Sequence, residues 1–178
     1  MIEKPIPFSA PMVQAILEGR KSMTRRVIKP QSKGIMKIPY HDGDRLYVRE
    51  PLKRIDWADG IPGIAYAADD EPAWDVTRPC RWVWKNASLP SMFMPKALTR
   101  IWLDVTGVRV ERVQEITPED CYAEGIVFVP IGEKRAEDEW AIAKYAHLWD
   151  SLNLKRGSGW EANPWVEVVE FKRVEGRP

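Results

Sequence analysis

The sequence contains little of what metalloproteins and membrane proteins need. Among its 178 residues it has only two cysteines, Cys80 and Cys121, and two histidines, His41 and His147. Four such residues scattered along a chain give neither a disulfide framework nor the spacing of a zinc site, so we expect no metal and no cofactor. No apolar run approaches the roughly 20 residues of a membrane helix. The first residues lack the basic and apolar segments of a secretory signal. We therefore expect a cytoplasmic protein without a membrane partner.

The sequence also lacks an excess of charge of either sign. Its formal net charge is +1, although 30% of its residues are charged and 44% are hydrophobic. This composition is typical of a globular domain with a real core, and the length suits one domain over residues 1–178. A protein of this charge does not bind polyanions over its whole surface. Nucleic-acid affinity would require a local patch, for which the basic segment 21–29 is the candidate.

Local patterns predict a small set of helices and strands. Ser9 is a suitable N-cap for a short helix, and Gly19 is a natural stop at its end. Thr117 followed by Pro118 and two acids predicts the start of a second helix, which ends before Gly125. The expected helices are 10–18, 117–124 and 135–152, and the expected strands are 45–50, 100–110 (one strand, or two broken at Gly107) and 165–174.

The segment 51–95 has no sustained periodicity. It contains six of the 15 prolines and four of the nine tryptophans. We interpret it as a long, irregular insertion that its aromatic side chains pack in part. The rest of the chain, with strands separated by turns and few short helices, predicts an α+β fold in which helices close the openings of a small β-barrel.

Three blocks of residues resemble the ASCH domain, a PUA-like β-barrel. In order, they are Gly19-x-Lys21-x-x-Thr24-x-Arg26, Gly43-Asp44-x-Leu46-x-Val48-Arg49-Glu50 and the segment 108–125. Residues 149–153 and 160–165 are similar to a branch common among bacteriophage and prophage proteins. The resemblance covers residues 5–50 and 96–174 and leaves the insertion outside the family's minimal core.

The resemblance implies a domain that binds RNA or a modified nucleobase in a cleft beside the barrel. One small bacterial member of the family is an amidohydrolase that removes the acetyl group from 4-N-acetylcytidine. Its lysine and threonine correspond to Lys21 and Thr24. Its glutamate corresponds to Glu124 in a looser alignment, with Glu119 and Glu115 as the fallback positions. The resemblance therefore implies a catalytic set of Lys21, Thr24 and Glu124.

Amide hydrolysis would need an activated nucleophile at this site. Thr24 supplies a hydroxyl that a base must activate, and Lys21 is such a base only if its pKa falls below the usual ~10.4. Burial lowers the pKa of a lysine, and so do nearby cations. The cations nearest in sequence, which are also the candidate ligand contacts, are Arg20, Arg25 and Arg26.

Glu124 has two possible roles in such a site. It could carry a proton to the leaving amine, or it could pair with Lys21, which would raise the pKa of the lysine and weaken it as a base. The sequence leaves both open. For Lys21 and Thr24 themselves, the plainer interpretation is contact with the last carbonyl groups of the preceding helix.

Several other residues are weaker candidates. Arg49 and Glu50 end the predicted strand 45–50 and point to opposite faces, so at most one of them reaches a ligand; a surface ion pair is the alternative for Glu50. Trp82 and Trp84 share a face and could stack on bases, although packing of the insertion is favoured. Cys121 at a helix start is better explained as a small packing residue than as a reactive thiol.

Two functions thus remain open from the sequence. The first is hydrolysis of the amide on the exocyclic amine of an N-acylated cytidine. The second is binding of RNA or a modified base without turnover. Both make a modified nucleoside or RNA the expected partner, and the sequence says nothing about protein partners.

Overall fold

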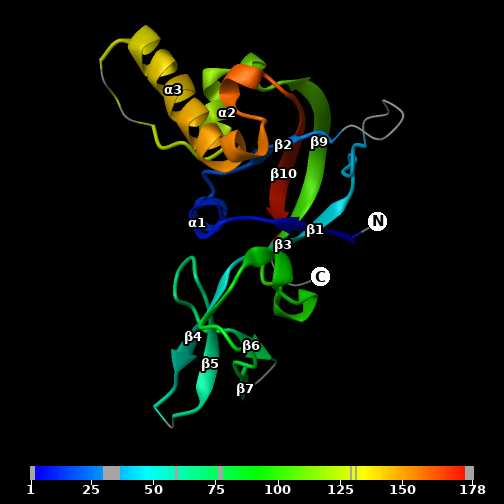
Figure 1. Cartoon of the computed structure of the whole chain (residues 1–178), viewed down its shortest axis with the longest axis vertical. Helices are drawn as coiled ribbons and strands as arrows, with labels where there is room; N and C mark the ends of the chain where they lie inside the picture. Colours follow the sequence, from blue (N-terminus) through cyan, green and yellow to red (C-terminus); the bar gives the residue numbers. More distant parts are fainter. Residues whose placement is uncertain are drawn as a thin grey trace. The chain divides into compact units, whose positions relative to one another are not determined.

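The computed structural model describes residues 3–29, 37–58, 60–75, 78–128, 130 and 132–174, with the backbone alone described at 75 and 78 (Figure 1). The predicted α+β class is confirmed. The strands are β1 (Glu3–Pro7), β2 (Met23–Val27), β3 (Arg45–Arg49), β4 (Leu52–Asp56), β5 (Pro62–Tyr66), β6 (Trp74–Asp75), β7 (Arg78–Pro79), β8 (Ser88–Leu89), β9 (Trp102–Arg112) and β10 (Trp165–Val174). The α-helices are α1 (Ala10–Leu17), α2 (Pro118–Ala123) and α3 (Lys134–Asn153), and short 3-10 helices include η1 (Ser91–Phe93), η2 (Lys96–Leu98), η3 (Val113–Glu115), η4 (Leu154–Arg156) and η5 (Trp160–Ala162).

The chain divides into two compact units. The first comprises Met1–Leu17, Arg45–Asp104 and Arg173–Pro178, and the second comprises Glu18–Asp44 and Val105–Lys172. Five strands follow one another in the order β1-β3-β9-β10-β2. In the first unit β1 pairs parallel to β3, and β3 pairs antiparallel to the start of β9. In the second unit β10 pairs antiparallel to β2. The expectation of one domain over the whole chain stays a prediction.

The second unit places two helices on one face of its strands. In Figure 1, α2 and α3 lie together on the same side of β2 and β10. Side chains that alternate along β10 pack beneath them, because successive residues of a strand point to opposite faces. The buried core of this unit contains Met23, Val113, Ile116, Cys121, Ala141, Tyr145, Trp149, Val166 and Val168. The helices therefore fix the surroundings of everything that β2 directs to this face.

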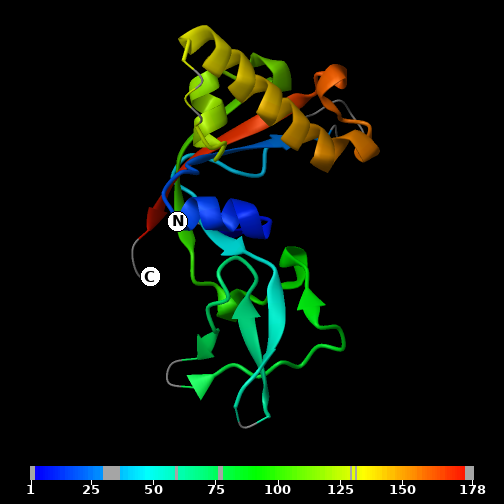
Figure 2. The ribbon, with the colours of Figure 1, turned by 90° about the vertical axis from the view of Figure 1, so that its left-hand side faces the viewer.

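The first unit contains the segment that the sequence marked as irregular. That interpretation was wrong for part of it, because β5, β4 and β8 form an antiparallel sheet within residues 52–89. Figure 2 shows β4 and β5 side by side. The sheet carries its own buried core, made by Leu52, Ile64, Tyr66, Ala73, Trp82, Leu89 and Met94. Tyr66 and Trp82 contribute to this core together with aliphatic side chains, without the sustained period that would have revealed the strands.

A tryptophan covers one glycine of this small sheet. A Cβ atom at Gly63 would lie 2.0 Å from the indole Nε1 of Trp57. The Trp57 ring in turn lies 6.1 Å from that of Trp74. A side chain at position 63 would displace the indole, so the glycine is part of the packing of the insertion.

The remaining predicted elements agree closely with the structure. The first helix ends before Gly19, which has a φ of +73°, and β9 runs through Gly107 as one strand. Outside the insertion, two strands were missed. β1 and β2 are each five residues long, and β2 reads Met-Thr-Arg-Arg-Val, with no alternation of apolar and polar residues. Arg25 is buried by ion pairs rather than by apolar character, which hides the strand from a hydropathy pattern.

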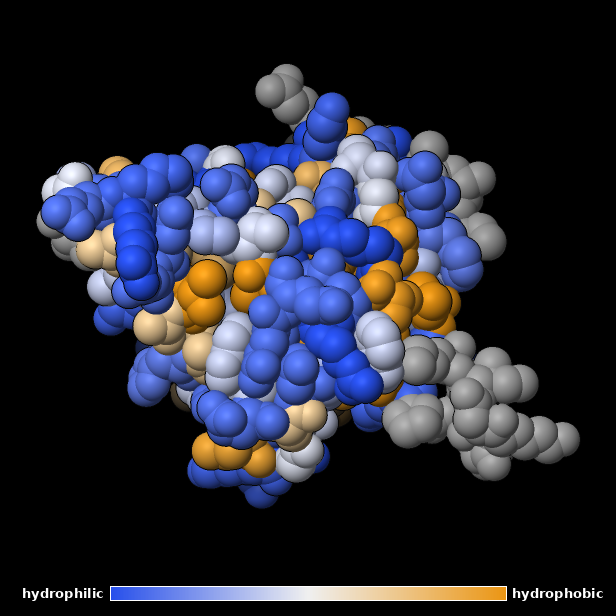
Figure 3. Space-filling model, turned by 90° about the horizontal axis from the view of Figure 1, so that it is seen from above, coloured by the Kyte–Doolittle hydropathy of each residue, from blue (hydrophilic) through white to orange (hydrophobic). Residues whose placement is uncertain are grey.

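One face of the molecule can be followed in the space-filling view (Figure 3). Figure 3 shows one face as largely hydrophilic, with separate apolar patches between the charged side chains. No helix in the described part of the chain is long and apolar enough to span a membrane.

Candidate active site at the end of helix α2

Lys21 is the most deeply buried cation of the second unit. It lies between the end of α1 and the start of β2, and its side chain has no exposed surface. Its Nζ donates one hydrogen bond of 2.6 Å to Oε2 of Glu124 and another of 2.8 Å to the backbone carbonyl of the same residue. The two residues that the resemblance implied as catalytic lysine and glutamate therefore lie in direct contact.

The local sequence explains why Glu124 is there. Thr117 caps α2, and its hydroxyl accepts a hydrogen bond from the backbone N–H of Asp120. The helix ends at Glu124 because Gly125 follows with a φ of +98°, a conformation that glycine adopts without strain. The backbone N–H of Ser22 donates to the carbonyl of Ala123 at 2.9 Å. This bond ties the residue after Lys21 to the last turn of α2.

Burial and charge act on Lys21 in opposite directions. Removal from water lowers the pKa of its ammonium below 10.5, and the cations of Arg26 and Arg25 lower it further. The carboxylate and hydrogen bond of Glu124 raise the pKa, but burial has the larger effect. Lys21 therefore releases its proton more readily than a lysine in water, as a base at this position must.

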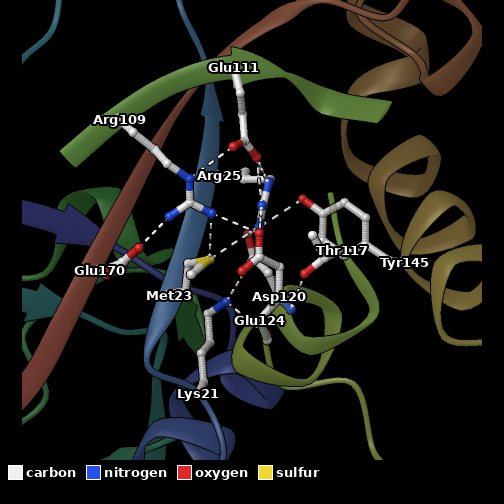
Figure 4. A network of polar contacts seen from close by, with 10 residues as sticks. All are labelled: Lys21, Met23, Arg25, Arg109, Glu111, Thr117, Asp120, Glu124, Tyr145 and Glu170. Carbon is white, nitrogen blue, oxygen red and sulfur yellow. Dashed lines mark hydrogen bonds and ion pairs between the residues drawn. The ribbon is translucent and has the colours of Figure 1, made fainter. Parts of the chain in front are cut away.

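Arg25 anchors a wider network on the same face (Figure 4). Its Nε and Nη2 donate to Oε1 of Glu111 at 3.0 and 2.6 Å, and Nη2 also contacts Asp120. Its Nη1 lies 3.6 Å from Oε1 of Glu124. The carboxylates of Glu111, Asp120 and Glu124 therefore all lie beside the guanidinium group of Arg25. This pairing of opposite charges offsets the cost of burying them.

Arg109 of β9 closes this network at its outer side. It donates to Glu111 at 2.9 Å and to Asp120 at 2.7 Å, and it also pairs with Glu170. The acids of the network are therefore occupied by arginines. In the described ranges, no three His, Cys, Asp or Glu side chains gather in a group that could hold a metal ion.

Tyr145 of α3 also reaches Glu124, a contact that the sequence did not predict. Its hydroxyl lies 3.5 Å from Oε1 of Glu124, and its side chain is buried. Burial beside that carboxylate raises the pKa of the phenol well above 10. The available signal was the stripe of Ala141, Tyr145 and Trp149 on one face of α3, which indicates burial but not a polar partner.

Thr24 and Arg26 lie on β2 and alternate with Arg25 along the strand. Their side chains therefore leave the strand on the face opposite to that of Arg25. Thr24 is buried and pairs with Val169 of β10. Arg26 is the cross-strand neighbour of Glu167, and burial lowers the pKa of its guanidinium. Whether Thr24 meets Lys21 in a reaction stays a prediction.

Arg20 is the most exposed of the candidate ligand contacts in this unit. It donates 2.7 Å to Glu18 and 3.0 Å to the carbonyl of Gly125. The fallback acids Glu115 and Glu119 are both exposed, and Glu115 accepts from the backbone N–H of Arg112 at 2.6 Å. Glu124 is thus the acid that the fold buries beside Lys21.

Arg49 and Glu50 belong to the first unit. The ion pair that was the alternative for Glu50 is present, with Arg100, but Glu50 has no exposed surface, so its expected place at the surface was wrong. It accepts two hydrogen bonds, of 2.9 and 2.8 Å, from Arg100, which also binds Asp69 and stacks on Tyr66. Burial raises the pKa of the Glu50 carboxyl, and Arg100 opposes that change. Glu50 and Arg100 therefore form a buried ion pair with a structural role.

The remaining candidates have structural roles as well. Trp82 is buried in the core of the first unit, and Trp84 packs against it with ring centroids 4.9 Å apart. Their indoles therefore pack the insertion, as favoured from the sequence. Cys121 is completely buried, and burial raises the pKa of its thiol to about 12, which agrees with a packing residue.

Comparisons with known proteins found similarity to this chain only in structure. No protein-family model matches it, and no curated protein matches it. A solved structure of protein EF3133 from Enterococcus faecalis V583, of family DUF984, is similar with a TM-score of 0.50 and 10% identity over 98% of this chain and 76% of that one. An ASCH domain from Lactobacillus crispatus JV V101 has a TM-score of 0.49 and 13% identity over 97% of this chain and 79% of that one. The likeness to EF3133 shows a shared fold.

Proposed function

We propose that this chain is an ASCH-domain protein of the phage-type branch that binds a modified nucleoside at Lys21, Thr24 and Glu124 and hydrolyses the amide of an N-acylated cytidine. The observation that carries the proposal is the buried contact between Lys21 Nζ and the Glu124 carboxylate. Lys21 is an amine kept from water, with a lowered pKa and one fixed acid beside it. These properties suit proton transfer better than the usual roles of a surface lysine, which are contact with solvent and exposed ion pairs.

Each residue has a defined task in the proposed reaction. The Thr24 hydroxyl attacks the acyl carbon, and its proton passes to neutral Lys21 as the C–O bond forms. The ammonium then stabilises the oxyanion. When the C–N bond breaks, the Lys21–Glu124 pair returns that proton to the exocyclic amine of cytosine. A water molecule next hydrolyses the threonine ester, which releases the carboxylic acid and restores the hydroxyl.

The second candidate function is binding of RNA or a modified base without turnover. The hydrogen bond from Lys21 to Glu124 favours it, because a paired carboxylate holds the lysine in its charged form. A permanently charged Lys21 would act as a hydrogen-bond donor to a base or a phosphate. Arg20, which is exposed near the same turn, would then add to the affinity.

One assay separates the two functions. Purified protein is mixed with 4-N-acetylcytidine, and formation of cytidine is followed by absorbance. We expect turnover that Thr24→Val and Lys21→Met abolish. Thr24→Val keeps the shape of the side chain and removes only the hydroxyl, whereas Lys53→Ala, which removes one member of an exposed ion pair with Asp70, should leave the rate unchanged.

The other outcomes are equally informative. Absence of turnover, together with RNA retention that falls with salt and with Lys21→Met, would replace the enzyme by the binding module. Absence of both turnover and retention would reject both functions and leave only the fold.

A further inference from the structure

The first unit holds a cation that its own acids do not neutralise. Arg49 is half-buried at the end of β3, and its one hydrogen bond runs from Nη1 to the carbonyl of Met92 at 3.0 Å. Its Nε is buried and has no acceptor within the described ranges. Among the residues that the structure describes, no carboxylate lies within ion-pair distance of this guanidinium. A buried N–H normally has an acceptor, so the Nε of this half-buried guanidinium is available to an acceptor from a ligand.

Two further buried polar groups of the first unit also lack hydrogen-bond partners among the described residues. The indole Nε1 of Trp102, a residue only 6% exposed, has no acceptor within the described part of the chain. The hydroxyl of Thr99, 5% exposed, is likewise unpartnered there. An indole N–H and a guanidinium Nε can only donate hydrogen bonds. Unsatisfied buried donors are rare and call for an acceptor.

The register of the strands places Arg49 and Trp102 on the same face of the sheet. Tyr47 of β3 is the cross-strand partner of Trp102 of β9, and Arg49 follows Tyr47 by two residues on the same face. The two rings lie 6.1 Å apart. The guanidinium of Arg49 lies 5.6 Å from the Tyr47 ring, and Lys96 Nζ lies 5.2 and 5.7 Å from the rings of Tyr47 and Trp102. Arg49 and Lys96 thus both lie beside the ring pair of Tyr47 and Trp102, which carries the indole N–H.

The neighbouring cations differ from Arg49 in that they have acids. Lys96 pairs with Glu3, and Arg45, on the same face of β3, donates to Asp104 at 2.8 Å. Of these three cations, Arg49 is the one that has no acid beside it among the described residues. It calls for a ligand with one or two negative charges and several acceptor oxygens, since donors approach from an arginine, an indole and a lysine.

We propose that Arg49, Trp102 and Lys96 (the Arg49 cluster) bind the phosphate group of a nucleotide or of a nucleic-acid strand. A phosphate offers acceptor oxygens in several directions, which a carboxylate does not. Apolar surface for an attached base is present beside it, because Met92, whose carbonyl holds Arg49, and Phe93 are 61% and 62% exposed on η1. Aromatic side chains next to cations are the usual means of binding unpaired bases.

Calorimetric titration with matched ligands tests the proposal. The probes are inorganic phosphate, cytidine 5′-monophosphate, cytidine, and a short single-stranded oligonucleotide, all at about 0.1 M salt, where distant charges are screened. We expect the phosphate-bearing ligands to bind and cytidine not to bind. Binding of the monophosphate assigns the site to a nucleotide, whereas binding of the oligonucleotide alone assigns it to a strand.

Variants locate the binding. Arg49→Ala and Trp102→Phe should each weaken it about tenfold or more, the loss expected for one charge-assisted or buried hydrogen bond. Trp102→Phe removes the indole N–H and keeps an aromatic ring, so it serves even if Arg49→Ala does not fold. Arg54→Ala, which removes an equal charge from an exposed ion pair with Asp56 in the same unit, should change the affinity by less than about twofold.

Two results would overturn the proposal. One is the absence of binding by every phosphate-bearing probe. The other is an equal loss in Arg54→Ala and Arg49→Ala, or no loss in Trp102→Phe, because either would show non-specific attraction to positive charge. Neither result bears on Lys21, whose proposed turnover is measured with a nucleoside that carries no phosphate.

Discussion

Lys21 directs both of its hydrogen bonds to Glu124 in this structure, one to the side-chain Oε2 at 2.6 Å and one to the backbone carbonyl at 2.8 Å. The segment before β2 is thereby joined to the end of α2 by two interactions. One is with the charged carboxylate of Glu124, and the other is with its neutral backbone carbonyl. A backbone acceptor remains in place whatever the charge of the carboxyl group. Lys21 can therefore lose or gain a proton without losing its position.

The first prediction concerns the stability of this pair. Glu124→Leu leaves the Lys21 ammonium buried without its acid, so we expect a loss of about 3–5 kcal/mol in the free energy of unfolding. The double variant Lys21→Met with Glu124→Leu should recover most of that loss, because an apolar pair replaces the buried ions. Urea unfolding of the single and double variants measures both. Equal stability of Glu124→Leu and the wild type would contradict the pair's contribution.

The second prediction concerns Tyr145 as a positioning residue. Tyr145→Phe removes the hydroxyl that meets Glu124, at a cost in folding of about 1 kcal/mol. A carboxylate with one hydrogen bond fewer attracts the Lys21 proton more strongly, so the pKa of Lys21 should rise. The acidic limb of the pH–rate profile for 4-N-acetylcytidine should then move to higher pH. Tyr122→Phe, whose ring packs against Phe128, is the control and should leave the profile in place.

The pKa shift of Lys21 can also be observed without turnover. Titration of its Nζ resonance by NMR should give a pKa below 10.5 in the wild type and a higher value in Tyr145→Phe. A purely structural Tyr145 would change the melting temperature and leave both titrations the same.

The third prediction concerns the ion pair of Glu50 and Arg100. Arg100→Met leaves the buried Glu50 carboxylate without its two hydrogen bonds, so we expect about 3 kcal/mol of destabilisation at pH 7. Burial already raises the folded-state pKa of Glu50, and loss of Arg100 raises it further. The penalty on the charged form should therefore shrink as the pH falls and the carboxyl group binds a proton.

Thermal unfolding from pH 7 to pH 5 tests this dependence. Arg54→Met, which breaks an exposed pair, should cost no more than about 0.5 kcal/mol at either pH. A penalty for Arg100→Met that grows on acidification would contradict the assigned role of Glu50.

The fourth prediction separates the two thiols. Cys121 is buried, and its pKa of about 12 leaves it protonated at pH 8, whereas Cys80 is partly exposed. Iodoacetamide should label one cysteine of the folded protein and two in urea. Cys80→Ser should abolish the labelling of the folded state, as read by mass spectrometry. Rapid labelling of Cys121 in folded protein would show that α2 opens easily.

The candidate site illustrates what local patterns can and cannot predict. Thr117, Pro118 and Gly125 fixed the ends of α2 in advance, because caps and helix stops depend on adjacent residues alone. Glu124 could be placed at the end of that helix for the same reason. Its contact with Lys21, 103 residues away in the chain, depends on how β2 packs beside α2. The sequence offered pairing with Lys21 only as one of two alternatives.

The insertion shows the opposite failure. Its aromatic side chains were expected to pack it in part, and Tyr66 and Trp82 are buried in its core, yet β4, β5 and β8 were missed. Their pairing is non-local, and the buried aliphatic and aromatic residues follow one another without a sustained regular period. Arg49 was expected to contact a ligand from its place in the strand, but its missing acid could be recognised only once every neighbour had a position.

The sequence alone determined where the three α-helices and the strands β3, β9 and β10 lie, the α+β class, and which residues could carry chemistry. Those properties follow from capping, periodicity and side-chain type, which act over a few residues. Only the tertiary structure decided which charges are buried and with whom they pair, as for Lys21 with Glu124 and Glu50 with Arg100. Burial and pairing depend on long-range packing, and they set the proton affinities on which any function of this protein depends.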